Sequence, residues 1–431
     1  MTAAEIAAAV GAGELDPAAA VEESLRALEE RAGLNAVISL CPEQALARAR
    51  TRPSGRLAGV PLLVKDLFDT AGVRTTYGST IYADHVPTRT ATAVRRLEEA
   101  GAIVVGKANL HEFAWGVTSQ NPHYGTVQNP RFPGRTTGGS SGGNAAALAA
   151  GLCALGLGTD TGCSVRLPSA CCGTVGFKPT WGAVPMEGCY PLCPSFDTAG
   201  PMARTVADVA LAFSVLSRAP VPKPRLEGLT LGLLLEPPPV EPVSPIVKGS
   251  DPHAWGRIVK GSDPFTIAVR RVEALGARVV EARIPAPEVD TWPLFLTEAA
   301  ASHRATFPAR RHDYGDNVRG KLELAQRADP VAAELARRAV ARWRRDTATE
   351  PAVDLFLCPT LGIPVPPVDV DELEYRLPLS VWARPFNVLG WAGLALGDLQ
   401  LVGRDDATVL AAGLALEEAH GSKAIAVPPE K

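Results

Sequence analysis

The chain has 431 residues, of which 46% are hydrophobic and 21% charged, as in an ordinary globular protein. Its net charge of −3 argues against nucleic acid or an anionic membrane as a partner. The first residues, Met1 to Glu5, have neither a basic nor a leucine-rich segment, so we expect no signal peptide and a cytoplasmic location.

The first hundred residues alternate predicted helices with short apolar strands. Asp16 and Pro17 supply a helix cap and a first-turn proline, and Gly33 supplies a stop. The predicted helices cover residues 2–10, 17–31, 43–50 and 90–100, and the predicted strands cover 35–40, 59–66 and 103–105. Helices that alternate with apolar strands favour a layered α/β fold.

The second of these strands, Gly59 to Asp66, has a lysine at its end. Burial disfavours the charged form of a lysine, so Lys65 is expected to have a lowered pKa and to act as a neutral base. Lys107 follows the next strand and is interpreted as a structural or solvated lysine. His111 and Glu112 resemble a metal-binding pair only superficially.

Two glycine-rich loops follow, each with a serine. Gly138 to Gly143 holds Ser140, and Gly158 to Ser164 ends on the second serine. Glycines let a backbone turn sharply and present its N–H groups to a phosphate or to the oxyanion of acyl transfer. The spacings of phosphate-binding loops and of the α/β-hydrolase elbow are absent. We therefore predict an oxyanion site.

A serine nucleophile needs a base. His111 and His123 lie nearest in the sequence but in a polar, loop-like stretch. Lys65 is the better candidate because Ser–Lys pairs are a known variant of the catalytic triad.

These segments together resemble the amidase signature family. The similarity runs from about Gly59 to Asp208 and includes Gly173 to Thr180 and Ser195 to Thr205. The family resemblance implies one domain over 1–431, built on a large central mixed β-sheet with helices on both faces. Its signature core is placed at about 56–208, a variable and substrate-shaping region at about 220–350, and the part that completes the sheet at 351–417.

The resemblance also implies the site residues. Ser164 would be the nucleophile, Ser140 the bridging serine after a cis peptide bond from Gly139, and Lys65 the base. The oxyanion would be held by the backbone N–H groups of Thr161, Gly162, Cys163 and Ser164. Asp160 and Arg166 flank the nucleophile and are expected to orient its loop, either as a structural ion pair or through a substrate contact.

Cys163 stands where the family usually has glycine. If its φ were positive, a cysteine there would cost about 1–2 kcal/mol; as an alternative nucleophile it is disfavoured by the serine–lysine arrangement beside it. The other cysteines are expected to be reduced thiols, and their spacings fit no zinc site. They are Cys41, Cys153, Cys171, Cys172, Cys189, Cys193 and Cys358.

Similarity to the family is weaker beyond Arg204. Residues 220–224 and 236–245 are proline-rich, and the segment at 246–252 recurs at 258–264. An arginine-rich helix is predicted over 332–346 and a strand over 355–360. Residues 394–397 replace a longer hairpin of the family, and we expect this shortening to open a sheet edge or weaken the core.

The sequence leaves three candidate functions open. The first is a stand-alone amidase that hydrolyses a small carboxamide without metal or cofactor. The second is the glutamine-hydrolysing A subunit of a tRNA-dependent amidotransferase, which would need partner subunits. The third is a catalytically degenerate homologue that acts as a binding protein. The expected partner is a small amide substrate, and a homodimer is compatible with the sequence.

Overall fold

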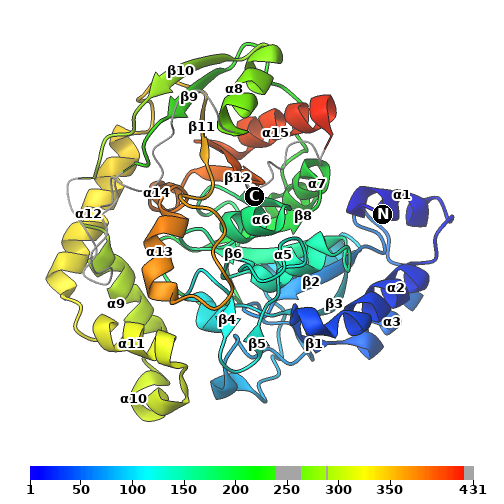
Figure 1. Cartoon of the computed structure of the whole chain (residues 1–431). Coiled ribbons are helices and arrows are strands. Elements are labelled where there is room, and N and C mark those ends of the chain that lie inside the picture. Colours follow the sequence, from blue (N-terminus) through cyan, green and yellow to red (C-terminus); the bar gives the residue numbers. More distant parts are fainter. Residues whose placement is uncertain (239–263, 288–289, 422–431) are drawn as a thin grey trace.

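The computed structural model describes residues 1–238, 264–287 and 290–421. Its centre is a mixed sheet whose described strands follow the order β1-β3-β2-β6-β8-β7-β12-β13-β11-β9-β10 (Figure 1). The pairs β2/β3, β2/β6, β9/β10 and β9/β11 are parallel, and the remaining neighbours are antiparallel. This is the predicted mixed sheet.

The strands are short and largely buried. Those of the main sheet are β1 (Val37–Leu40), β2 (Pro61–Lys65), β3 (Ile103–Ala108), β6 (Leu155–Asp160), β7 (Val175–Lys178), β8 (Thr198–Ala203), β9 (Thr230–Leu234), β10 (Arg278–Ala282), β11 (Leu355–Pro359), β12 (Ala392–Leu396) and β13 (Leu399–Gly403). A separate two-stranded ribbon pairs β4 (Gln120–Asn121) with β5 (Gly125–Thr126).

One face of the sheet packs on helices that share a single apolar core. They are α1 (Ala3–Gly11), α4 (Thr92–Glu99), α7 (Val206–Ser217), α8 (Pro264–Ala274) and α15 (Asp406–His420). On β2, Leu62 and Val64 point into this core and Leu63 into the core of the opposite face. Side chains alternate across a strand, so a wholly apolar strand serves both faces.

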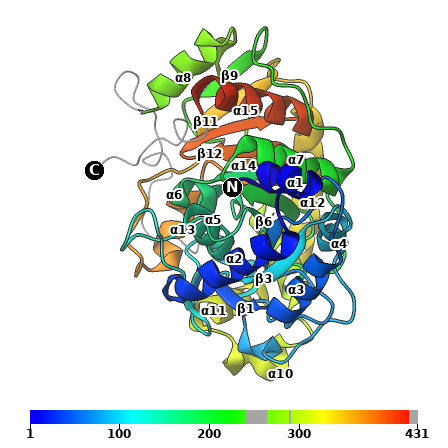
Figure 2. The same cartoon turned by 90° about the vertical axis from the view of Figure 1, so that its right-hand side faces the viewer.

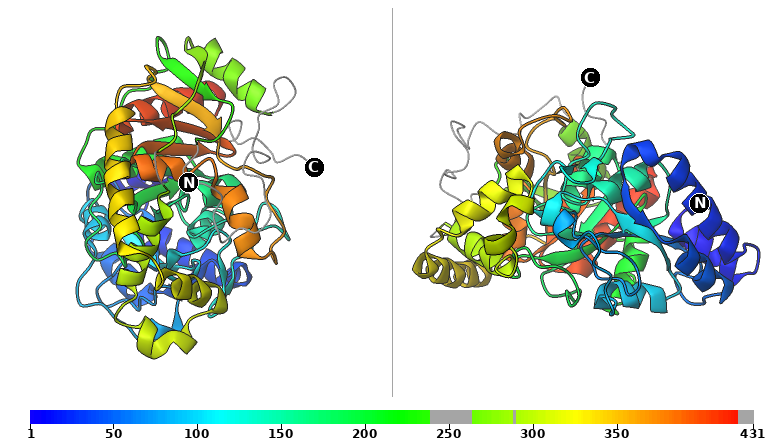
Figure 3. Two further views of the ribbon diagram at one scale, coloured as in Figure 1. Left: turned by 90° about the vertical axis from the view of Figure 1, so that its left-hand side faces the viewer. Right: turned by 90° about the horizontal axis from the view of Figure 1, so that it is seen from below.

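The opposite face is covered by two groups of helices. The N-terminal group is α2 (Pro17–Glu30), α3 (Pro42–Arg50), α5 (Gly142–Ala149) and α6 (Arg166–Cys172). The later group is α9 (Trp292–Ser302), α10 (Phe307–Arg310), α11 (Asp316–Ala325), α12 (Pro330–Asp346), α13 (Glu372–Ser380) and α14 (Arg384–Leu389). Figure 2 views the molecule from the side of α1 to α3, and Figure 3 shows α9 to α12, in yellow, at the opposite end. The prediction of helices on both faces is confirmed.

Most predicted elements appear within two residues of their expected ends. One strand differs in a way that bears on the site. The strand expected to end at Val105 continues to Ala108, so Lys107 lies inside it. None of the helices in the described part of the chain is both long and apolar enough to cross a membrane.

The expectation that the short segment 394–397 opens a sheet edge is wrong. These residues end β12 and form the tight turn to β13, in the interior of the sheet. β12 pairs with both β7 and β13, and β13 also pairs with β11, so no edge is opened here. The repeated segment at 246–264 lies almost entirely outside the described residues.

Candidate active site

Lys65 ends β2 and is completely buried. Its Nζ donates hydrogen bonds to Oγ of Ser140 at 2.7 Å and to Oγ1 of Thr159 at 2.8 Å. Burial disfavours the ammonium form and lowers the pKa of Lys65 to about 7. The lysine therefore carries a neutral amine in a substantial fraction of molecules at neutral pH.

Ser140 lies in the turn just before α5, and the Gly139–Ser140 peptide bond is cis. Its glycine loop is packed too closely for side chains. A Cβ on Gly139 would lie 2.9 Å from the backbone nitrogen of Ser119, and one on Gly143 would lie 2.4 Å from the carbonyl oxygen of Asn109. The glycines thus let the loop approach the neighbouring backbone and hold Ser140 against Lys65.

Ser164 lies between β6 and α6, where it lines a pocket. Its carbonyl oxygen accepts a hydrogen bond from the N–H of Ser141 at 3.3 Å, which joins the two serine loops. The fold therefore gathers the three predicted residues: Lys65 and Ser140 in direct contact, and Ser164 on the adjoining loop facing the pocket.

Asp160 and Arg166 form a buried ion pair that spans the Ser164 loop. Nε and Nη2 of Arg166 each donate to one carboxylate oxygen of Asp160 at 3.0 Å, and the guanidinium also donates to Gln400 and Asn387. Burial opposes ionisation, but the charge and hydrogen bonds of Arg166 outweigh it and lower the pKa of Asp160 to about 2. Both side chains are fully buried and neither lines the pocket, which favours the structural ion pair over a substrate contact.

The backbone N–H groups of the Ser164 loop form two sets, one bonded to Asp160 and one without a partner among the described residues. Oδ2 of Asp160 accepts the N–H groups of Val165 and Arg166 at 3.1 and 3.3 Å. In contrast, the N–H groups of Thr161, Gly162, Cys163 and Ser164 donate to no residue that the structure describes, and these four residues line the pocket. The side chain of Thr161 is fixed by a 2.6 Å hydrogen bond to Asp197. The loop thus leaves unpaired donors at the pocket wall.

Cys163 adopts no positive φ, since it is absent from the positive-φ residues of the described chain. The free-energy cost expected for a cysteine with positive φ therefore does not apply at this position. Its thiol is buried, 3.9 Å from the carbonyl oxygen of Gly139, and burial raises its pKa to about 12. The thiol is therefore protonated at neutral pH, which disfavours it as a nucleophile.

Lys107 serves the structure around the site. Its Nζ donates to the carbonyl oxygen of Phe68, to Thr70 at 3.1 Å and to Thr75 at 3.0 Å, and it lies 3.7 Å from Asp66. It fixes the chain that follows β2.

The side chains of His111 and Glu112 contact different partners and do not face a common metal position. Nε2 of His111 lies 3.1 Å from Asn317, whereas Glu112 contacts His123 at 2.8 Å and Ser79 at 2.7 Å. Over residues 1–238, 264–287 and 290–421, no three His, Cys, Asp or Glu side chains are grouped to hold a metal ion. None of the eight cysteines forms a disulfide bond in the structure.

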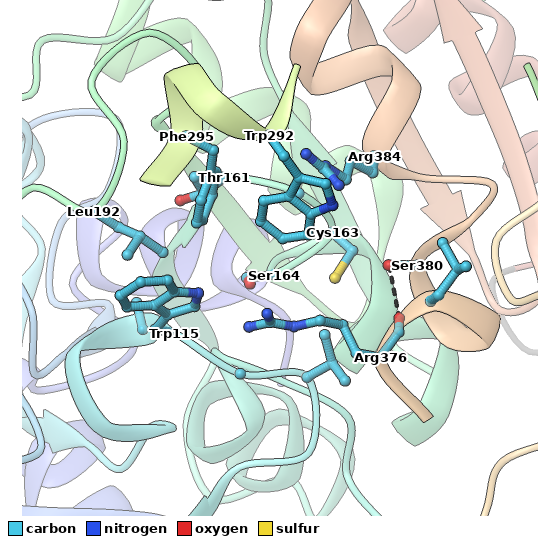
Figure 4. A pocket seen from close by; sticks show the side chains of 15 residues that line it. Trp115, Thr161, Cys163, Ser164, Leu192, Trp292, Phe295, Arg376, Ser380 and Arg384 are labelled. Atoms are coloured by element: carbon cyan, nitrogen blue, oxygen red, sulfur yellow. Dashed lines mark hydrogen bonds between the residues drawn. The ribbon is translucent and has the colours of Figure 1, made fainter. Parts of the chain in front are cut away.

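The pocket that contains Ser164 encloses about 630 Å³ of empty space, part of it open to solvent. Figure 4 shows Ser164 surrounded by aromatic side chains and two arginines. The walls come from Trp115, Leu192, Trp292, Phe295, Arg376 and Arg384. Sequence reasoning assigned no role to any of them, because they are far apart in the chain and carry no motif.

Sequence comparison identifies relatives over most of the chain. The profile of the Amidase family matches residues 19–226. The A subunit of the glutamyl-tRNA(Gln) amidotransferase of Maridesulfovibrio salexigens is 32% identical over 425 aligned residues, which cover 84% of this chain and 82% of the relative. The protein of the same name from Deinococcus radiodurans is 45% identical, but there the match covers 50% of this chain and 46%, about half, of the relative.

A solved structure described as an amidase extends the comparison to nearly the whole fold. It is 32% identical, covers 97% of this chain and 99% of its own chain, and superimposes with a TM-score of 0.83. With the matching profile and the relative aligned over most of both chains, the similarity is sufficient to assign the family. The chain belongs to the amidase signature family and is a hydrolase that acts on amide C–N bonds.

Proposed function

We propose that the protein is a stand-alone amidase that hydrolyses a small carboxamide through a Ser–Ser–Lys acyl-enzyme mechanism. The observation that carries this proposal is the 2.7 Å contact between the buried Lys65 amine and Ser140, with the lysine pKa at about 7. A base poised near the working pH is best suited to move protons.

The first half of the reaction forms the acyl-enzyme. Neutral Lys65 accepts the proton of Ser140 as Ser140 takes the proton of Ser164, and Ser164 Oγ bonds to the amide carbon. The carbonyl oxygen becomes an oxyanion, held by the unpaired N–H groups of residues 161–164. The C–N bond then breaks, and the lysine proton returns through Ser140 to the leaving amine.

The second half releases the acid. Water gives one proton through Ser140 to Lys65, and its oxygen attacks the ester carbon. When the ester C–O bond breaks, the proton returns to Ser164, and the carboxylate product leaves. Asp160 and Arg166 hold the loop in place during both halves and do not touch the reacting atoms.

The regions expected from the sequence would supply different parts of the site, and their boundaries remain part of the proposal. The core at about 56–208 carries the reacting groups. The region at about 220–350 contributes Trp292 and Phe295 to the pocket, and the part at 351–417 contributes Arg376 and Arg384. The cytoplasmic location expected from the sequence stays a prediction.

A second candidate is the glutamine-hydrolysing component of an amidotransferase, which the names of the aligned bacterial relatives favour. The residues that line the pocket favour this candidate less than the stand-alone amidase. Glutamine carries an ammonium group, which calls for a carboxylate partner, yet no Asp or Glu is found among the described residues that line the pocket. The third candidate, a degenerate binding protein, is disfavoured by the contact between Lys65 and Ser140.

The test is a panel of primary and secondary amides, with glutamine included, assayed with the wild-type protein and with Ser164→Ala and Lys65→Ala. Hydrolysis of at least one amide that both variants lose would support the amidase. Glutamine as the preferred substrate, together with co-purifying partner proteins, would support the amidotransferase instead. Binding of amides without turnover would favour the degenerate homologue.

A further inference from the structure

One wall of the pocket beside Ser164 is a short piece of irregular backbone. Residues 114–117 line the pocket, and Trp115 contributes its ring to this wall (Figure 4). Residues 115–117 belong to no helix or strand. Because such backbone has no hydrogen-bond ladder of its own, other groups must pair with it, and their contacts determine where the wall lies.

Two side chains from the later part of the chain hold both ends of this wall. Nζ of Lys321 on α11 donates to the carbonyl oxygen of Trp115 at 2.6 Å. The N–H of Val117 donates to Oε1 of Glu372 on α13 at 3.1 Å. Lys321 and Glu372 form an ion pair at 2.7 Å, and both are almost completely buried. We call this pair, closed on the backbone of residues 115–117, the Lys321–Glu372 clamp.

The hydrogen-bonding capacity of the clamp is fully used. Nζ of Lys321 has a third acceptor, Oδ1 of Asn317 at 2.5 Å, so its three N–H donors are all engaged. Oε2 of Glu372 also accepts Nδ2 of Asn317 at 3.1 Å, and Oε1 lies 3.3 Å from Nε of Arg376. Burial opposes ionisation of Glu372, but the charges of Arg376 and Lys321 hold its pKa well below the ordinary range. Buried polar groups that are paired in this way are fixed in one arrangement.

A histidine that the reaction does not use supports the middle of the wall. Gly116 lies so close to the ring of His111 that a Cβ on the glycine would lie 2.3 Å from ring atoms. Nε2 of His111 lies 3.1 Å from Oδ1 of Asn317, the oxygen that Lys321 also contacts. Burial lowers the pKa of His111 to about 4, so the ring is neutral at pH 7, and its Nε2 donates because the amide oxygen can only accept. The wall is therefore supported at each of residues 115–117.

The bonds of the clamp end on the wall and on α11 and α13, away from the reacting groups. The loop of Ser140 is held by other contacts. The carbonyl oxygen of Ser140 accepts the N–H of His111 at 3.2 Å and the hydroxyl of Ser119 at 3.3 Å. Opening the clamp is therefore expected to release the wall and to leave the nucleophile in place.

We propose that Lys321 and Glu372 are positioning residues for substrate binding, which hold the Trp115 wall where the apolar body of an amide packs. The inference rests on the proposed function, since it assigns the pocket to an amide. Leu192, Trp292 and Phe295 supply apolar surface to the same pocket. Loss of the clamp should weaken binding and keep the chemical step, so that KM rises while kcat is kept.

The experiment compares the best aromatic amide with the smallest amide that the protein hydrolyses, whose body does not reach the wall. Glutamine has one acceptor oxygen, so Glu372→Gln cannot serve both Val117 and Lys321. Glu372→Gln and Lys321→Met should each raise KM for the aromatic amide about tenfold, the worth of apolar contacts in a pocket, and change kcat by less than about threefold. KM for the small amide should stay within about threefold. The double variant should raise KM no further than the larger single change, because either change opens the same clamp.

The matched control is Glu417→Gln on α15. Glu417 also accepts two backbone N–H groups of a distant segment, those of Val206 and Ala207 at 2.8 and 2.9 Å, but it is not among the described residues that line the pocket. Both KM values should stay within about threefold in this variant. Burial and then the charge of Arg376 lower the pKa of Lys321 to about 7, so all proteins are compared at one pH.

Hydrogen exchange of residues 114–119, read by mass spectrometry, tests the clamp without any substrate. In Glu372→Gln the amide of Val117 should exchange about tenfold faster than in Glu417→Gln, because its acceptor is lost. If neither clamp variant folds, Asn317→Ala on α11 takes their place, since it removes a partner from both Lys321 and Glu372, and the same two changes are expected.

Unchanged exchange, faster exchange with an unchanged KM, or an equal rise of KM in the control would each overturn the inference. A loss of kcat as large as the rise of KM would also overturn it, because the clamp would then support the reacting groups. Faster exchange in a protein that hydrolyses no amide would refute the proposed function and still support the clamp.

Discussion

The two regions that meet at the pocket are built on different principles. In the signature region, Lys65, Ser140, Asp160 and Arg166 are held by short hydrogen bonds to one another or to their neighbours. In the later region, Arg376 retains a buried nitrogen without a partner among the described residues, and Trp292 and Phe295 contribute apolar surface to the pocket.

From this difference we infer that the signature region carries out the reaction and that the later region determines which substrate binds. The reacting groups come from two glycine loops and the end of β2, and a Cβ on Gly139 or Gly143 would collide with neighbouring backbone. The walls that the later region contributes come from α9, α13 and α14, outside those loops. The following four expectations test this separation.

The largest effect is expected at Ser164. Ser164→Ala should lower kcat for any amide substrate by about 10⁴-fold or more, because the nucleophile is lost while the fold is kept. Steady-state kinetics measures the loss, and circular dichroism checks the fold. A variant that keeps a tenth of the activity would place the nucleophile elsewhere.

Next comes the ion pair beneath the loop. Asp160→Asn leaves Arg166 buried without its counter-charge and should reduce the free energy of unfolding by about 3–5 kcal/mol. The matched control is Glu334→Gln, which breaks exposed pairs on α12 and should cost less than about 1 kcal/mol. Urea unfolding of both variants provides the comparison, and equal losses would refute the structural role of Asp160.

The pH dependence should follow Lys65. The base must be neutral, and its pKa is lowered to about 7 by burial, so kcat/KM should rise as pH increases through about 7. Well below that value it should fall about tenfold for each pH unit, in proportion to the neutral fraction. Lys65→Arg, which stays charged, should be inactive throughout. A profile flat from pH 5 to 8 would contradict a lysine base.

The smallest effect is expected at Cys163. Only its backbone N–H is assigned a task, so Cys163→Ala should change kcat/KM by less than about threefold, and thiol reagents should leave the protein active. A large loss of kcat/KM in this variant would indicate that Cys163 takes part in the reaction.

Much of the reacting region was predictable because its signals are local. An apolar strand that ends on lysine and two glycine loops with serines specify their own backbone, and the observed contact between Lys65 and Ser140 agrees with them. For Asp160 and Arg166 the sequence left two roles open, a structural ion pair or a substrate contact, and the buried contact between them favours the ion pair. Their roles in the reaction stay predictions.

The rest depends on contacts that no local pattern encodes. Gln400 and Asn387 complete the network around Arg166 from more than 200 residues away. Trp292, Arg376 and Arg384 look like ordinary helix residues, and only the packing of α9, α13 and α14 brings them to one pocket. The predicted open edge at 394–397 was wrong because a shortened loop was equated with a missing strand, whereas β12 and β13 pair on both sides.

The most direct test of the account needs no substrate. The protein and its Lys65→Ala variant are treated with a sulfonyl fluoride at mildly alkaline pH, and intact mass and the labelled peptide are read by mass spectrometry. We expect a single adduct on Ser164 that disappears in the lysine variant. An adduct on Cys163, or equal labelling of Ser164 in both proteins, would contradict a nucleophile activated by Lys65 through Ser140.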